Sequence, residues 1–234
     1  MNKESQNEIN FPNGYQLHRA HVVSSKTGTD DDTTTAEPEQ KINSVQSVWL
    51  TKLSFRIALL SMFTAISVVL AYTLASVPNV ELFTMAIFLG GFIMGKKEGI
   101  LIGTLSAVIF VFFNPWGVSP LPLMIYQVIH YALTGLVGAL THDLLKGRSF
   151  YHPAKDLYTL PIMILLGFIG GILTLSFDLI TSLIGAITIF GTLDAFVPYF
   201  LSGIVFTTIH EVGNILGFVF ILPGLIQVAY KILH

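Results

Sequence analysis

Long apolar runs alternate with short polar breaks from Leu53 to the end of the chain. A helix needs about 20 predominantly apolar residues to cross a bilayer, and fewer where the bilayer thins. The pattern therefore predicts an all-α membrane protein built as a bundle of six transmembrane helices. We place these helices at residues 53–75, 81–95, 100–113, 121–144, 158–189 and about 195–230.

The second and third of these helices are short, at 14–15 residues, or about 22 Å by helical rise. The break between them, residues 95–99, holds three charged side chains that are difficult to place inside a lipid-facing helix. We therefore expect either two shortened spans or one tight hairpin enclosed by a larger bundle.

Residues 1–46 have a different composition, with seven acidic and four basic side chains and few large apolar ones. Such a segment cannot bury enough apolar surface to offset the entropy lost on ordering it. We expect a disordered cytoplasmic tail over 1–46 and a six-helix transmembrane domain over 47–234. His18 and His21, three apart in the tail, are interpreted as solvated side chains rather than metal ligands.

Composition supports the membrane assignment and narrows the chemistry. Hydrophobic residues make up 53% of the chain and charged residues 11%, and the mean hydropathy is +0.71. A soluble domain of this size needs more charge to cover its surface. The net charge of −2 argues against a nucleic-acid partner. The absence of cysteine excludes disulfides and thiolate metal sites.

The basic residues predict the orientation. With the six helices above, all twelve Lys and Arg residues fall on one side of the membrane. The opposite loops, at 76–80, 114–120 and 190–194, contain none. Because basic loops stay in the cytoplasm, we expect both termini inside and these three loops outside.

Polar residues collect near the outer side and predict a binding pocket. An aspartate at membrane depth costs roughly 2.5–3.5 kcal/mol on insertion scales, so such groups should face a cavity or one another. Together these groups suit a small polar organic ligand. The candidate residues are Asn79, Glu81, Asn114, Trp116, Gln127, His130, Asp178 and Thr181.

Simpler interpretations exist for three of these residues. Trp116 can be an interfacial anchor. His130 can be a hydrogen-bonding link between helices, and Asp178 can cap or cross-link helices without touching a ligand.

The segment from His210 to Asn214 resembles half of a metalloprotease helix. Zinc binding would need a second histidine where Asn214 stands, so no metal site is predicted. We interpret His210 and Asn214 as a buried polar cluster on one helix face, beneath the pocket. The alternative is an intramembrane enzyme using His210, Glu211 and Asp178, but we expect Asp178 and His210 to lie at different depths.

Two further features concern partners. No Walker A sequence occurs, so uphill transport would draw its energy from another subunit. In the first helix small side chains recur at Ser54, Ala58, Ser61 and Ala65. Such a stripe allows close approach of a second helix, either within the chain or from a partner.

Taken together, these residues resemble the substrate-binding S components of energy-coupling factor (ECF) vitamin transporters. The resemblance covers nearly all of residues 50–232 and rests on the order and spacing of several segments. These are the six spans, the small stripe, the Pro78-Asn79-Val80-Glu81 turn, the break at 95–99, the Asn114-Pro115-Trp116-Gly117 loop, Phe177-Asp178 and His210 to Asn214. The acidic tail departs from the family's usual short N-terminus.

The resemblance implies a non-enzymatic protein without a cofactor that captures a vitamin or precursor from outside. It would then dock, through Ala58, Ser61 and Ala65, onto a transmembrane ECF scaffold subunit bound to two cytoplasmic ATPase subunits. The outer turn favours cobalamin or its precursors, while riboflavin and pyrimidine or queuosine precursors remain open. A ligand-free membrane scaffold protein is a further alternative.

Overall fold

The computed structural model describes residues 48–77, 81–114 and 117–233. All regular elements in these residues are helical, which confirms the predicted all-α class. The predicted tail, 1–46, lies outside the described residues.

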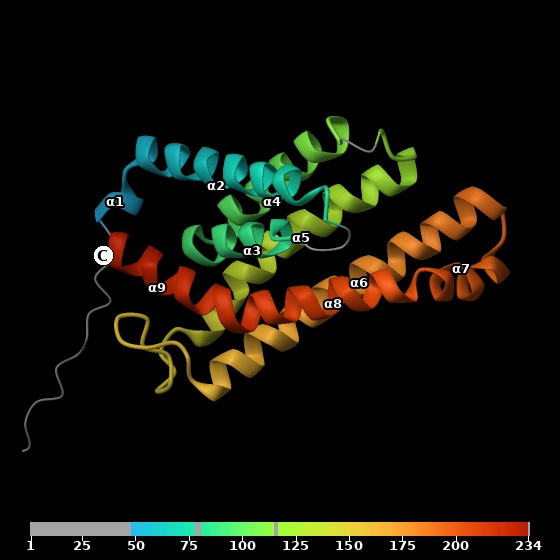
Figure 1. Cartoon of the computed structure of the whole chain (residues 1–234). Coiled ribbons are helices and arrows are strands. Elements are labelled where there is room, and N and C mark those ends of the chain that lie inside the picture. The colour runs from blue at the N-terminus through green and yellow to red at the C-terminus, as the bar shows by residue number, and fades with distance from the viewer. Residues whose placement is uncertain (1–47, 78–80, 115–116, 234) are drawn as a thin grey trace, which may run out of the picture. The chain divides into compact units, whose positions relative to one another are not determined.

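The first group of helices packs into a compact bundle (Figure 1). α2 packs against α3 and α4, both of these pack against α5, and α1 leads into α2. The bounds are α1 Val48–Thr51, α2 Leu53–Leu74, α3 Phe83–Met94, α4 Lys96–Phe112 and α5 Leu121–Leu145. The predicted helices 53–75 and 121–144 thus differ from α2 and α5 by a single residue.

The second group is formed by the C-terminal part of the chain. α6 packs along α7 and α8, while α9 reaches back to α3 (Figure 1). The bounds are α6 Leu160–Phe190, a 3-10 turn Leu193–Ala195, α7 Phe196–Ser202, α8 Ile204–Leu216, a π-helical turn Gly217–Ile221 and α9 Leu222–Leu233.

A single residue joins α3 to α4. Gly95 has a φ of 97°, and Lys96 already belongs to α4. The expectation that the helices stop over 95–99 is therefore wrong. The positive φ at Gly95 is sufficient to end α3, and the charged residues after it form the first turn of α4.

Glycines bring α3, α4 and α5 into backbone contact. A Cβ placed on Gly91 would lie 1.9 Å from the carbonyl oxygen of Gly135. One placed on Gly135 would lie 2.0 Å from the carbonyl oxygen of Gly99. Missing side chains at these positions let the helices pack by van der Waals contact, which drives helix association in lipid. These three helices form the most closely packed part of the fold.

α3 is the central helix. Its residues from Phe83 to Phe92 are all buried, which agrees with a helix that is apolar on every face. Phe88 packs edge-on against Phe218 of the π-helical turn, with ring centroids 5.1 Å apart. This contact joins the two groups of helices.

The last predicted helix, 195–230, is broken once. The chain turns at Gly203 between α7 and α8, whereas α8, the π-helical turn and α9 continue as one helix from Ile204 to Leu233. Gly203 has a low helix propensity and no Cβ to restrict its backbone. The preceding helix, α6, is continuous and starts at Leu160 rather than 158, with Pro161 in its first turn.

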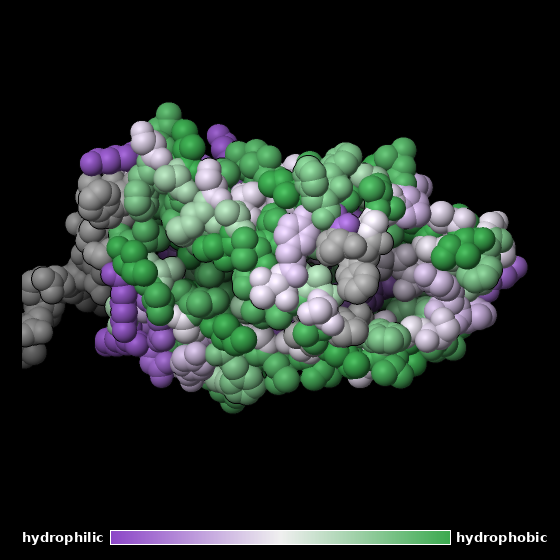
Figure 2. All heavy atoms as spheres, turned by 45° about the horizontal axis from the view of Figure 1, so that its top comes forward, coloured by the Kyte–Doolittle hydropathy of each residue, from purple (hydrophilic) through white to green (hydrophobic). Residues whose placement is uncertain are grey.

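Four helices are long and apolar enough to cross a membrane: Leu53–Leu74, Leu121–Leu145, Leu160–Phe190 and the segment Ile204–Leu233. They indicate a multi-pass membrane protein. Figure 2 shows mainly hydrophobic residues along the helices and strongly hydrophilic ones gathered toward the end that holds α1 and the end of α9.

Contacts between elements place the described basic residues at the end of the molecule that holds α1 and the end of α9. Arg56 in α2 pairs with Glu98 in α4, and Lys96 pairs with Asp143 near the end of α5. Gln227 of α9 donates a hydrogen bond to the carbonyl oxygen of Lys155, at 3.3 Å. The other described basic residues are near these in sequence or lie at the ends of the same elements. They are Lys52, Lys97, Lys146, Arg148 and Lys231.

Candidate functional site

A cavity of about 500 Å³ lies toward the other end of the molecule, between the two groups of helices. The cavity is lined by the C-terminal ends of α2 and α4, which are far from the basic residues. The start of α3 and parts of α5, α6 and α8 complete the lining. Its described lining consists of Ala71, Leu74, Ala75, Ser76, Val77, Glu81, Phe83, Phe110, Gln127, Tyr131, Phe177, Asp178 and His210.

Four aromatic rings form one continuous wall of the cavity. Phe83 lies 5.3 Å from Phe110 and 4.6 Å from Tyr131, measured between ring centroids. Tyr131 lies 5.6 Å from Phe177, which comes from α6. Such a wall offers a large, rigid apolar surface to a flat ligand.

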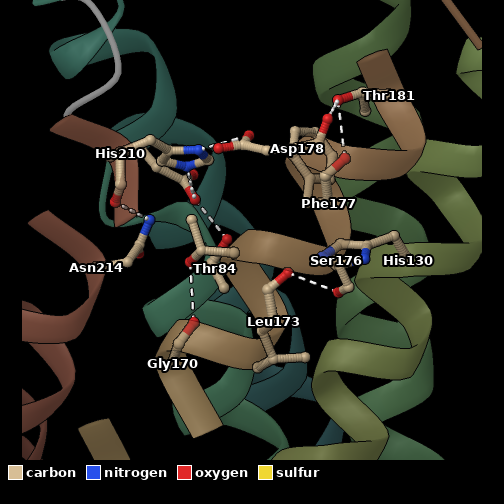
Figure 3. A network of polar contacts seen from close by, with 12 residues as sticks. Thr84, His130, Gly170, Leu173, Ser176, Phe177, Asp178, Thr181, His210 and Asn214 are labelled. Carbon is tan, nitrogen blue, oxygen red and sulfur yellow. Dashed lines mark hydrogen bonds and ion pairs between the residues drawn. The ribbon is translucent and has the colours of Figure 1, made fainter. Parts of the chain in front are cut away.

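Opposing helices meet at a buried acid–histidine–acid group. His210 of α8 places Nδ1 2.9 Å from Asp178 Oδ1 on α6, and Nε2 3.4 Å from Glu81 Oε1. Figure 3 shows His210 and Asp178 facing each other from these two helices. Both are buried, at 8% exposed each.

The geometry of this group fixes the role of the imidazole. Carboxylate oxygens accept hydrogen bonds, and a histidine donates from both ring nitrogens only as the imidazolium. With a carboxyl oxygen near each ring nitrogen, His210 links Glu81 and Asp178 across the cavity.

Neighbouring polar side chains hold the group in place. Thr84 Oγ1 donates to Glu81 Oε1, and Asn214 Nδ2 donates to the backbone carbonyl of His210 at 3.3 Å. Burial alone would raise the pKa of Glu81, but hydrogen bonds from His210 and Thr84 and the charge of His210 bring it below its ordinary value. Glu81 is thus held as the carboxylate.

The contact between Asp178 and His210 corrects the expectation that they lie at different depths. α6 and α8 pack side by side, so residues 32 apart in sequence meet at one level. His210 and Asn214 are both buried, as expected of one interior helix face.

Glu211 does not join this group. Its carboxylate lies against Gly171 of α6, and it is not part of the described cavity lining. Among the described contacts, Glu211 makes no hydrogen bond to His210 or Asp178.

Only one of the two polar residues expected on α5 reaches the cavity. Gln127 lines it, whereas His130 lies behind the aromatic wall. The His130 ring is 5.0 Å from that of Phe177, and its Nδ1 is 3.3 Å from Tyr126 Oη.

Thr181 lines a different cavity. Its hydroxyl donates to the carbonyl oxygen of Phe177 at 2.8 Å, on its own helix. It borders a space of about 260 Å³ between α5, α6 and α7, which Tyr199 also lines. Thr181 is therefore outside the described lining of the Asp178 cavity, although a spacing of three places the two residues on neighbouring parts of α6.

The remaining candidates are not placed at the cavity. Asn114 follows α4 but is absent from the described lining. Asn79 and Trp116 lie outside the described residues. Among the described residues, no three His, Asp or Glu side chains are arranged to hold a metal ion.

Sequence reasoning missed the aromatic wall and the role of His210 as a lining residue. Phe83, Phe110 and Tyr131 stand in apolar runs where aromatic residues are common, so nothing in their spacing distinguishes them. His210 had a detectable signal, since an ionisable residue within a span is a candidate functional residue by default.

The small-residue stripe of α2 faces away from the bundle. Ala58, Ser61 and Ala65 are exposed, while Leu59, Phe63 and Ser67 form the buried face of the helix. Within the described residues, the stripe does not serve packing inside the chain.

Comparison of the chain with family models, curated proteins and solved structures found no match.

Proposed function

We propose that this protein is the substrate-binding subunit of an ECF-type importer in the cell membrane. It would capture a vitamin or vitamin precursor from outside the cell. The observation that carries the proposal is the cavity of about 500 Å³, which brings a buried acid–histidine–acid group beside an aromatic wall. This volume is within the range of about 300–1,000 Å³ found for small-molecule sites.

The proposed topology has six crossings, with both termini in the cytoplasm. α3 and α4 would be the second and third crossings, shortened and enclosed by longer helices. The basic residues grouped near α1 and the end of α9 would then face the cytoplasm, as basic loops do. In this orientation the cavity opens toward the outer side.

Docking would use the exposed stripe of α2. Ala58, Ser61 and Ala65 present little side-chain volume, so a helix of a scaffold subunit could approach the backbone closely. Two ATPase subunits bound to that scaffold would supply the energy, since the chain has no Walker A sequence.

Because of the resemblance to ECF S components, we propose cobalamin-type molecules as the first candidate ligands. A macrocycle of that size would place only part of its structure in a cavity of about 500 Å³. Smaller precursors would be enclosed more completely.

The test is to purify the full chain in mild detergent and identify by mass spectrometry any small molecule that copurifies. A bound vitamin-like compound that also raises the melting temperature of the protein is the expected result. If no small molecule copurifies or stabilises the chain, the protein is a ligand-free scaffold and the proposal fails.

An intramembrane enzyme is the second candidate, favoured by the direct contact of His210 and Asp178. However, both His210 ring nitrogens face carboxylates, so neither is free to act as a base. Glu211→Gln distinguishes the two functions. Turnover of the copurified molecule that disappears in this variant would favour the enzyme, whereas unchanged binding without turnover favours the importer.

A further inference from the structure

The charges around the cavity are predominantly negative. Glu81 and Asp178 are acidic, and the one basic side chain in the described lining, His210, lies between them. The described lining contains no Lys or Arg. The described basic residues belong to the opposite end of the helices, where Arg56 and Lys96 form their ion pairs.

Two acceptor atoms on lining side chains are buried without a donor. Asp178 Oδ2 and Gln127 Oε1 have no hydrogen-bond partner among the described residues. Asp178 itself is more than nine-tenths buried. Because buried acceptors are normally satisfied, the site is complementary to a molecule that brings N–H groups.

The aromatic wall adds a constraint on shape. Phe83, Phe110, Tyr131 and Phe177 form a linked series of rings that line the same cavity as these acceptors. Aromatic faces attract flat rings by stacking and cations by their quadrupole.

We propose that the cavity selects a planar heteroaromatic ligand carrying an amino or other cationic nitrogen, which donates to Asp178 and Gln127 while its ring lies on the aromatic wall. This inference rests on the proposed binding function and replaces the cobalamin-type cargo favoured by the resemblance with a small ring compound. The ligand's nitrogen would bring positive charge to a lining whose described titratable groups include two acids and a single histidine.

The same arrangement disfavours ligands whose recognised group is a carboxylate or a phosphate. Such a group would approach two carboxylates, and its only basic neighbour in the described lining would be His210. Like charges in a low-dielectric site repel strongly, so the discrimination is by charge as well as by hydrogen bonding.

The test uses two probes that share one ring, pyridoxamine and 4-pyridoxate, which carry an ammonium and a carboxylate at the same position. The purified full chain, dialysed free of bound compounds, is titrated with each at pH 7.5 by calorimetry and by thermal shift. We expect pyridoxamine to bind at least about tenfold more tightly, the ratio for one charge-assisted hydrogen bond.

Two variants and a control locate the effect. Asp178→Asn keeps an acceptor for His210 but removes the charge, and should weaken pyridoxamine binding by about tenfold. Gln127→Leu removes the other acceptor and should also weaken it, which keeps the test decisive if Asp178→Asn misfolds. Ser182→Ala, at the second cavity between α5, α6 and α7, should leave binding unchanged.

Failure of this inference differs from failure of the proposed function. Equal or tighter binding of 4-pyridoxate, or no binding of pyridoxamine, overturns the ligand class. A copurifying carboxylic acid would do the same while leaving the importer intact. Absence of any bound small molecule overturns both.

Discussion

His210 Nδ1 lies 2.9 Å from Asp178 Oδ1, in a contact between α8 and α6 that is buried on both sides. Glu81, from the segment before α3, lies 3.4 Å from Nε2, the other ring nitrogen of the same imidazole. One side chain thereby joins three parts of the chain around the cavity. The stability of the fold and the chemistry of the site thus depend on the same residues.

The first prediction concerns this pair. His210→Ala removes the shared imidazole and leaves two neighbouring carboxylates buried, so the free energy of unfolding should fall by about 3–5 kcal/mol. Adding Asp178→Asn should restore part of the loss. Thermal unfolding of the two single variants and the double variant measures the coupling, and strictly additive losses would mean that the pair does not interact.

The second prediction concerns acid. The pKa of Glu81 is lower in the folded chain than its ordinary value of 4.5. The folded state therefore binds fewer protons, and the stability from this group is present above about pH 4.5 and lost as the pH falls below it. In melting curves taken across this range, the advantage of the parent protein over Glu81→Gln should shrink at low pH. A constant difference would contradict it.

The third prediction tests the packing of the glycines. Gly91→Ala would place a methyl group 1.9 Å from the Gly135 carbonyl oxygen, and helix backbone cannot yield as a side chain can. We expect a loss of about 3 kcal/mol, at the upper end of overpacking costs. Gly213→Ala is the matched control, because nothing lies within 4 Å of its added Cβ. It should melt at or above the parent temperature.

The fourth prediction concerns orientation. Because the chain has no cysteine, single cysteines report topology without background. An impermeant maleimide added to intact cells should label Val118→Cys and Thr192→Cys, and should label Lys97→Cys only after permeabilisation. These residues are all exposed. Labelling of Lys97→Cys in intact cells would reverse the proposed orientation.

The fifth prediction concerns docking. Ala65→Trp should abolish uptake in cells that supply the scaffold and ATPase subunits, while ligand binding to the purified chain stays intact. Ile66→Trp is the control, since Ile66 is also exposed but points about 100° away around α2. Equal loss of uptake in both variants would argue against docking through the stripe.

Much of the fold could be predicted from the apolar pattern because helix ends coincide with strong local signals. α2 and α5 begin and end within a residue of their predicted positions. The α3–α4 boundary and the break in the last helix could not be predicted in the same way. There the helix ends depend on the backbone conformation of single glycines, Gly95 and Gly203, and glycines also occur inside the helices, as at Gly91 and Gly135.

The site was less predictable than the helices. Periodicity identifies which residues share a face of one helix, as Gln127 and His130 do, but it does not define the relative height of two helices. Only the packing of α6 on α8 brings Asp178 to His210. The same limit explains why Gln127 lines the cavity while His130 does not.

The shortness of α3 has a consequence for how the protein is made. Its 12 residues extend about 18 Å, well short of a hydrocarbon core of about 30 Å. Since protein covers its side chains from Phe83 to Phe92, α3 gains little by contact with lipid. We infer that it cannot be inserted alone and reaches its position only when α4 and α5 close around it. The protein would then reach its fold when α4 and α5 pack around α3, rather than by inserting one helix at a time.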